Sequence, residues 1–311
     1  MTSHTAKLTP EQAETLRGIL AKRDFEPAEV PHAVFSYKRP KLAVTWYKSG
    51  KLLIQGKGTQ EFVEFTLEPE VLGQAAFADA LDAQPEQLEP RIGVDESGKG
   101  DFFGPLVVAG VYVNEPVARA LDSLGVKDSK AITSDKKIAA LAKGIRGTPG
   151  CVYSVVPIGN ASYNRLYQKM RNVNKILAWG HARVIENLLG QRYRMEPPPL
   201  RAISDQFARS KATIQSALME EGRQLKLVQM HKAESDIAVA AASILARDIF
   251  VQRLAALGQE FDLELPKGAS SKVDAAGAAF LKKHGLAKLG QAAKLHFRTT
   301  QKIQPQLGQA E

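Results

Sequence analysis

The sequence predicts an α/β protein whose central sheet is flanked by helices and preceded by a small α+β domain. From residue 92 onward, apolar runs of β type alternate with segments of helical periodicity, which is typical of a layered α/β fold. Before residue 60, one capped helix precedes several short β-rich runs. A polar segment that contains two prolines separates the two regions. We therefore predict a domain over 1–80, a linker over 81–91 and a larger domain over 92–311.

The N-terminal domain is expected to begin with a helix. Thr9 is a suitable N-cap and Pro10 suits the first helical position. Gln12 can close a capping box, and the helix then runs to about Lys22. The strands predicted next lie at 33–37, 42–47 and 52–55, with a tight turn at 49–50 and a helical or mixed segment over 59–80.

These β-rich runs carry a concentration of positive charge. Residues 31–60 contain six lysines and arginines and no aspartate or glutamate. A solvated sheet face would explain such a pattern, but the basic character of the whole chain favours a surface that contacts phosphates and uses aromatic rings for sugar or base contact. The predicted substrate-binding residues of this surface are Trp46, Tyr47, Lys48 and Lys51.

The larger domain is predicted to start with a β-hairpin over residues 92–113 that has acidic residues near its bend. Further strands are predicted at 151–157, 200–204 and 225–229, and helices at 134–143, 160–189, 211–221 and 235–257. The segment from residue 258 onward is rich in lysine and includes Lys294. Such a run is usually a solvated face, with nucleic-acid contact as the alternative.

Composition limits the classes of function. A net charge of +9 over 311 residues indicates a polyanionic partner, with nucleic acid the leading candidate. The single cysteine, Cys151, excludes an intramolecular disulfide and a cysteine-based zinc cluster, and fits a reducing compartment. No apolar run reaches the length of a membrane span, and the N-terminus lacks the layout of a signal peptide. We expect a cytoplasmic monomer without a membrane partner.

Acidic residues occur at three places where such a sheet would bring them together. Asp95 and Glu96 end the first strand, Asp205 follows the strand at 200–204, and either Glu234 or Asp236 begins the alanine-rich helix. Each could be a helix cap or a turn residue when taken singly. Clustered carboxylates repel one another unless cations lie between them, so the set predicts Mg²⁺ or Mn²⁺, with two ions suited to phosphodiester hydrolysis.

Two neighbouring residues on a strand point to opposite faces of the sheet. Asp95 and Glu96 can therefore serve one metal centre only if the backbone bends at once. We expect that bend in the glycine-rich turn that follows.

A competing motif overlaps the same residues. Residues 93–99 match the start of a phosphate-cradling P-loop, G-x-x-x-x-G-K. Gly100 stands where the serine or threonine metal ligand belongs, and Asp95 and Glu96 would place negative charge in an anion site. A strand-like segment follows where a P-loop requires a helix. These features exclude a nucleoside triphosphatase.

Residues 95–105, Asp-Glu-Ser-Gly-Lys-Gly-Asp-Phe-Phe-Gly-Pro, resemble the signature of type 2 ribonucleases H, and the Gly-Lys-Gly form with two phenylalanines resembles ribonuclease HIII. Supporting motifs lie at 127–130, 170–175, 205–207 and 231–235, the last leading into the alanine-rich helix. The N-terminal domain, through residues 46–51 and 55–56, resembles the TATA-box-binding-protein-like domain that precedes the catalytic domain in that family.

The resemblance implies a mixed ribonuclease H-like sheet and endonucleolytic cleavage of the RNA strand of RNA–DNA hybrids, leaving 5′-phosphate and 3′-hydroxyl ends. By motif position, the catalytic and metal-binding acids are Asp95, Glu96, Asp205 and Glu234, which leaves Asp236 as a helix-start residue. It also implies substrate contacts by Gly98, Lys99, Gly100, Lys130 and Ser243. The alternatives are ribonuclease HII-like excision at single embedded ribonucleotides and a non-catalytic nucleic-acid-binding protein.

Overall fold

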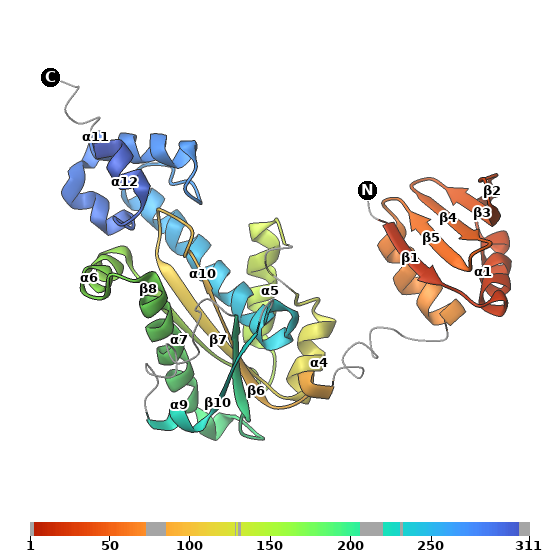
Figure 1. Ribbon diagram of the computed structural model, residues 1–311, viewed down its shortest axis with the longest axis horizontal. Helices are drawn as coiled ribbons and strands as arrows, with labels where there is room; N and C mark the ends of the chain where they lie inside the picture. The colour runs from red at the N-terminus through yellow and green to blue at the C-terminus, as the bar shows by residue number, and fades with distance from the viewer. Residues whose placement is uncertain are drawn as a thin grey trace. The chain divides into compact units, whose positions relative to one another are not determined.

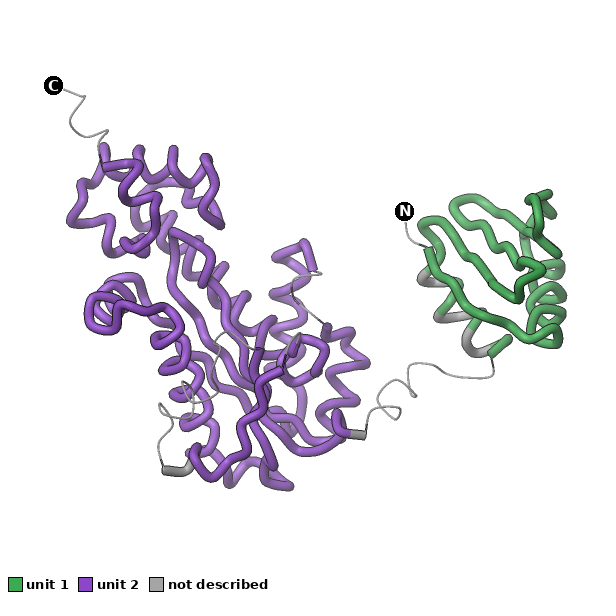
Figure 2. The backbone as a smooth tube through the Cα atoms, in the orientation of Figure 1, with its two compact units in different colours: residues 1–84 green, residues 85–311 purple. Residues whose placement is uncertain are grey.

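The computed structural model describes residues 3–72, 85–127, 129, 132–205, 220–230 and 233–304. The chain divides into two compact units, Met1–Gln84 and Pro85–Glu311 (Figure 1; Figure 2). Within the segment interpreted as a linker, residues 81–84 lie outside the described residues. Residues 85–91 are grouped with the second unit, and Arg91 is fully buried there.

The first unit is a five-stranded antiparallel sheet with strand order β1-β5-β4-β3-β2. Its elements are β1 (Ser3–Lys7), α1 (Pro10–Lys22), β2 (Glu26–Pro27), β3 (Ala33–Arg39), β4 (Leu42–Tyr47), β5 (Lys51–Gln55), α2 (Thr59–Phe62) and the π-helix η1 (Val63–Leu72). Helix α1 begins with the expected capping box, in which Thr9 Oγ1 accepts from Gln12 N and Gln12 Oε1 accepts from Thr9 N. Strands β1 and β2 were not expected from the sequence, because both are short and largely exposed and are defined by pairing with β5 and β3.

The second unit is built on a five-stranded mixed sheet with strand order β10-β9-β6-β7-β8. Three strands, β6 (Arg91–Ser97), β7 (Leu106–Val113) and β8 (Val152–Ile158), form an antiparallel meander. Strands β9 (Arg201–Asp205) and β10 (Lys226–Met230) add to β6 in parallel. The predicted α/β class with a mixed central sheet is therefore confirmed.

Helices cover both faces of this sheet (Figure 1). The long helix α10 (Ile237–Glu260) crosses one face and packs on β6 and β7, with α4 (Glu115–Ser123) and α5 (Asp135–Gly147) beside it. The other face is covered by α7 (Val173–Leu189). The remaining elements are η2 (Pro85–Gln87), α6 (Asn160–Met170), η4 (Arg192–Arg194), α9 (Glu220–Gln224), η5 (Ala233–Ser235), α11 (Ser271–Ala292) and α12 (Arg298–Ile303).

The helices of the second unit differ from the sequence expectations at two places. The helix expected at 211–221 lies almost entirely outside the described residues, which resume at α9. Helix α4 was not expected, although its start signals are in the sequence: Asn114 caps it by accepting from Val117 N, and a proline follows the cap. Among the described residues, none of the helices combines the length and the apolar composition that a membrane crossing requires.

Gly93 allows β6 and α10 to lie unusually close together. A Cβ atom at this position would lie 2.2 Å from the main chain of Ala238 and Val239. We expect Gly93→Ala to lower the free energy of unfolding by about 1–3 kcal/mol, because the obstructing atoms are backbone and one whole helix would have to shift. Urea denaturation would measure the loss. Gly147→Ala is the matched control, since a Cβ there meets nothing within 4 Å; an equal loss in both variants would contradict the prediction.

Candidate active site

The predicted acids gather at one edge of the sheet. Strands β6, β9 and β10 run parallel, so their carboxyl ends meet at the same edge. Val94 pairs with Ser204, which places Asp95 and Asp205 next to each other at the ends of adjacent strands. Glu234 follows β10 in the short turn η5, which packs against β9. Topology alone thus brings Asp95, Asp205 and Glu234 to the same edge.

Asp95 and Glu96 belong to opposite faces of the sheet. Asp95 lies toward α10, where it accepts a hydrogen bond from the side chain of Ser243. Glu96 lies toward α7, where its Oε2 is 3.0 Å from His181 Nε2. Strand β6 continues through Ser97, so the bend expected in the glycine-rich turn comes after both acids and leaves them on opposite faces.

The negative charge of the carboxylates at this edge of the sheet is energetically unfavourable without a cation. Burial, followed by the charge of Glu96, raises the pKa of Asp95 to about 7, against the opposing hydrogen bond from Ser243. Within the described ranges, no three aspartate, glutamate, histidine or cysteine side chains converge as a ready-made metal site. Mutual repulsion separates like-charged carboxylates, and an all-oxygen donor set suits hard divalent ions. The donor chemistry therefore fits Mg²⁺ or Mn²⁺.

Two serines connect Asp95 to a neighbouring loop. Ser243 and Ser129 are both buried, and their Oγ atoms lie 2.6 Å apart. The main-chain carbonyl of Ser129 accepts from Arg247 Nη1 at 2.6 Å, and the same nitrogen donates to Ile132 O. In this structure Ser243 thus supports Asp95. Lys130, expected beside it as a phosphate contact, lies outside the described residues.

The turn from β6 to β7 combines an exposed tip with a buried base. Gly98 has a φ of +88°, and a Cβ there would lie 2.2 Å from Pro105 O, so glycine is required. Lys99 and Gly100 are exposed, and Lys99 Nζ lies 3.8 Å from Glu96 Oε1. The main chain of the tip is therefore open to a ligand directly beside the acids.

His181 was not identified from the sequence. It is fully buried on α7, a helix that packs close to β7 because Gly180 faces Val108, the residue opposite Glu96 in the sheet register. The available signal was a single histidine within an otherwise apolar helix face, which more often indicates a core residue than a functional one.

Comparison with known proteins follows the same division of the chain. Residues 92–300 match the family described as Ribonuclease HII, and residues 3–73 match a domain of unknown function. Ribonuclease HIII of Chlamydia trachomatis is 42% identical over 305 residues, covering 97% of both chains. The chain belongs to the ribonuclease HIII family. Ribonuclease HIII of Chlamydia pneumoniae is 44% identical over 300 residues, covering 95% of this chain and 96% of the relative.

Solved structures agree with this membership of the ribonuclease HIII family. The crystal structure of Bst-RNase HIII in complex with Mn²⁺ matches with a TM-score of 0.65 and 31% identity, covering all of both chains. Aquifex aeolicus RNase H3 matches with a TM-score of 0.52 and 27% identity, covering 94% of this chain and 99% of that one. The catalytic unit is thus a ribonuclease H fold, and the N-terminal unit fits the expected TATA-box-binding-protein-like domain.

The N-terminal unit of this ribonuclease HIII family member has one open, basic sheet face. Trp46 packs against Phe35 on the face covered by α1, with ring centroids 5.7 Å apart. Tyr47 and Lys51 share the opposite face, where Lys7 lies directly across from Lys51 in the antiparallel register. Of the two aromatic residues expected to contact substrate, the structure therefore makes Tyr47 available and turns Trp46 inward. Lys48 is exposed in the turn after β4, and the contribution of Lys7 was missed.

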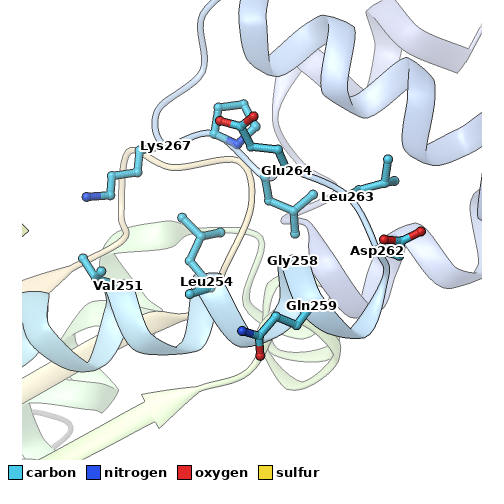
Figure 3. A pocket seen from close by; sticks show the side chains of 11 residues that line it. Val251, Leu254, Gly258, Gln259, Asp262, Leu263, Glu264 and Lys267 are labelled. Atoms are coloured by element: carbon cyan, nitrogen blue, oxygen red, sulfur yellow. The ribbon is translucent and has the colours of Figure 1, made fainter.

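A cavity of about 730 Å³ lies at the C-terminal end of α10 (Figure 3). Its lining comes from residues 251–267 and includes the apolar side chains of Leu254 and Leu263 together with Lys267. This lining contains none of the predicted site residues. In the ribonuclease HIII fold seen here, the acids lie at a sheet edge and not in this cavity.

Proposed function

We propose that this protein is an endonuclease that hydrolyses the RNA strand of RNA–DNA hybrids and leaves 5′-phosphate and 3′-hydroxyl ends. The observation that carries the proposal is the position of Asp95, Asp205 and Glu234 at the shared carboxyl edge of three parallel strands, beside the turn that is exposed at 99–100. Membership of the ribonuclease HIII family and the relative solved with Mn²⁺ support it. We place the protein in the cytoplasm as a monomer.

The acidic side chains of the sheet edge would hold the divalent ions. Asp95, Asp205 and Glu234 offer oxygen donors from β6, β9 and η5. Glu96 lies on the other face of β6, but its charge acts on Asp95, so we propose it as the fourth donor, reaching the ions around the end of the strand. When bound, two Mg²⁺ or Mn²⁺ ions supply an activated water and stabilise the departing 3′ oxygen. Ser243 holds the Asp95 carboxylate by a hydrogen bond, and His181 holds the Glu96 carboxylate.

Selection of RNA is assigned to the turn at 98–100. Glycines permit a close approach of the main chain, and the ribose 2′-hydroxyl is the group that distinguishes RNA from DNA. Lys99 is exposed and adds positive charge near the phosphates. Lys130 remains part of the proposal as a phosphate contact.

The direct test is cleavage of an RNA–DNA hybrid labelled at the 5′ end of its RNA strand, with Mg²⁺, with Mn²⁺ and with a chelator. We expect metal-dependent internal cuts in the RNA, with products that a polymerase extends and a ligase joins without prior phosphorylation. Binding without turnover under either ion would favour the non-catalytic alternative. A duplex that contains one ribonucleotide tests the ribonuclease HII-like alternative, which requires efficient cleavage there.

The open face of the N-terminal sheet is proposed to track phosphates. Lys7 and Lys51 lie directly opposite each other, and like charges in that arrangement destabilise a sheet unless an anion compensates. We expect Lys7→Ala with Lys51→Ala to weaken hybrid binding and to flatten the slope of log affinity against log salt by roughly 1 to 2, because each lost phosphate contact removes about 0.9.

The matched control for this prediction removes two basic residues from the other side of the same unit. Arg17 and Lys22 are exposed on α1, which covers the opposite face of the sheet. Arg17→Ala with Lys22→Ala makes the same change in net charge. Equal slopes for the two double variants, measured by fluorescence anisotropy over a salt series, would refute the role of the open face.

A further inference from the structure

The glycine-rich turn is held in place by two segments from distant parts of the chain. On one side, Gly268 N donates to Asp101 Oδ1 at 2.6 Å and Gly268 O accepts from Phe102 N. On the other side, Gly104 N donates to Ala292 O, and Phe103 forms a β-bridge with Ala293. The base of the turn is thus fixed by the segment after α10 and by the C-terminal end of α11.

Lys294 is the unexpected member of this arrangement. The sequence placed it in a lysine-rich, solvated run, but its side chain is fully buried. Its Nζ donates to Asp101 O at 2.8 Å and to Gly104 O at 2.6 Å, two carbonyls at the base of the turn. Burial lowers the pKa of Lys294 to about 7.

Neighbouring side chains reinforce these contacts. Asn160, the first residue of α6, also donates to Gly104 O, at 2.8 Å. Asn164, one turn further along α6, donates to Gly290 O and Ala293 O and accepts from Leu295 N. Helix α6 therefore fixes the segment that carries Lys294 on both sides of that residue.

A buried ammonium contributes little net stability to a fold, because removing it from water is unfavourable. Lys294 donates its hydrogen bonds to the carbonyls of residues 101 and 104. These two carbonyls lie at the base of the turn whose tip is 98–100. Drawing both carbonyls inward fixes the direction in which the tip projects. The tip itself lies outside this contact and stays exposed at Lys99 and Gly100.

We propose that Lys294 is a positioning residue for substrate selection, which holds the main chain of 98–100 at the place where it meets the sugar of the RNA strand. The inference rests on the proposed function for its substrate. It assigns the C-terminal segment around Lys294 to recognition of the hybrid, not only to the stability of the fold.

The test compares the full-length protein with its Lys294→Met variant. Affinities for a short RNA–DNA hybrid and for a DNA duplex of the same sequence are measured in a chelator, which prevents turnover. We expect the preference for the hybrid to fall about tenfold, the effect of roughly one lost hydrogen bond. With metal present, kcat/KM on the hybrid should fall by at least as much, with part of the loss in KM.

A merely structural role predicts a different pattern. It would lower the melting temperature and the fraction of active protein while leaving KM and the ratio of the two affinities unchanged, and that result would overturn the inference. Lys283→Met is the matched control, because Lys283 also donates to a main-chain carbonyl, that of Asp262, but does not contact the turn. It should leave the ratio unchanged.

A second variant covers the case in which Lys294→Met does not fold. Asn160→Ala removes the other side-chain donor to Gly104 O, and a smaller fall in the same ratio is expected. An unchanged ratio there would overturn the inference. Failure of the proposed function looks different: wild-type protein would prefer the hybrid without cleaving it, and the effect of Lys294 on that preference would still be measured.

Discussion

Asp95→Asn is expected to reduce cleavage of an RNA–DNA hybrid by about a thousandfold or more. The substitution keeps the size of the side chain but removes one of the negative charges that would hold the divalent ions, and metal stabilisation of the transition state is worth several kcal/mol. The fold should survive, because the substitution removes a charge that burial and the charge of Glu96 already disfavour. Single-turnover cleavage in saturating Mn²⁺ gives the rate.

A second measurement separates loss of metal from loss of fold. Mn²⁺ should raise the melting temperature of the wild-type protein, since a ligand that binds only the folded state stabilises it. The shift should shrink in Asp95→Asn, whose melting temperature without metal stays at or above the wild-type value. Asp122→Asn, an isosteric change on α4, should match wild type in both assays. Full activity of Asp95→Asn would remove Asp95 from the catalytic site.

Asp236→Ala is expected to cost about 3–5 kcal/mol of unfolding free energy, the largest stability effect among these variants. The reason is an ion pair in the core: Arg91 Nε lies 2.7 Å from Asp236 Oδ2, with the Arg91 side chain fully buried. Asp236 Oδ1 also accepts from Ala238 N and caps α10. Removing the carboxylate leaves a buried guanidinium without its counter-charge.

Two comparisons make this prediction specific. Asp236→Asn keeps an oxygen for the cap and should retain about 1 kcal/mol that the alanine variant loses. Lys302→Met breaks the surface pair with Asp274, which at 2.9 Å is also close, and should cost much less than Asp236→Ala because solvent screens it. Urea denaturation of the three variants gives the order. A loss below 1 kcal/mol for Asp236→Ala would show that Arg91 finds other compensation.

The hydrophobic periodicity, together with the capping and turn residues, was sufficient to predict most of the fold. The run Leu106–Val113 is buried along its whole length, as its uninterrupted apolar character indicates, and it forms the interior strand β7 between β6 and β8. The start of α1 was predictable because a capping box is a local signal. Strands β1 and β2 were not, since a short, exposed edge strand is defined by the partner it pairs with and not by its own residues.

The candidate site was predictable only in part, and for different reasons. Spacing left Glu234 and Asp236 as alternatives; the structure gives Asp236 to the cap and to Arg91, while Glu234 lies in η5 beside β9. The contact between His181 and Glu96 depends on how closely α7 approaches β7, and no local sequence pattern predicts that distance. The expectation of a solvated face is wrong for Lys294. Its ammonium is buried because it binds two main-chain carbonyls of a turn that is distant in sequence, and the local sequence does not show this contact.

The order of strands in the sheet of the second unit also affects how the protein folds during its synthesis. Strands β6, β7 and β8 pair with the strands next to them in sequence. In contrast, β9 pairs with β6 although residues 98–200 separate the two strands in sequence. Closing so large a loop is entropically costly, and pairings of this kind form late in folding. The acids are divided between the two sides of that pairing. With the acids in the proposed catalytic role, a chain that is still emerging from the ribosome has an incomplete site, and hydrolytic activity is expected to appear only with the final, cooperative step of folding.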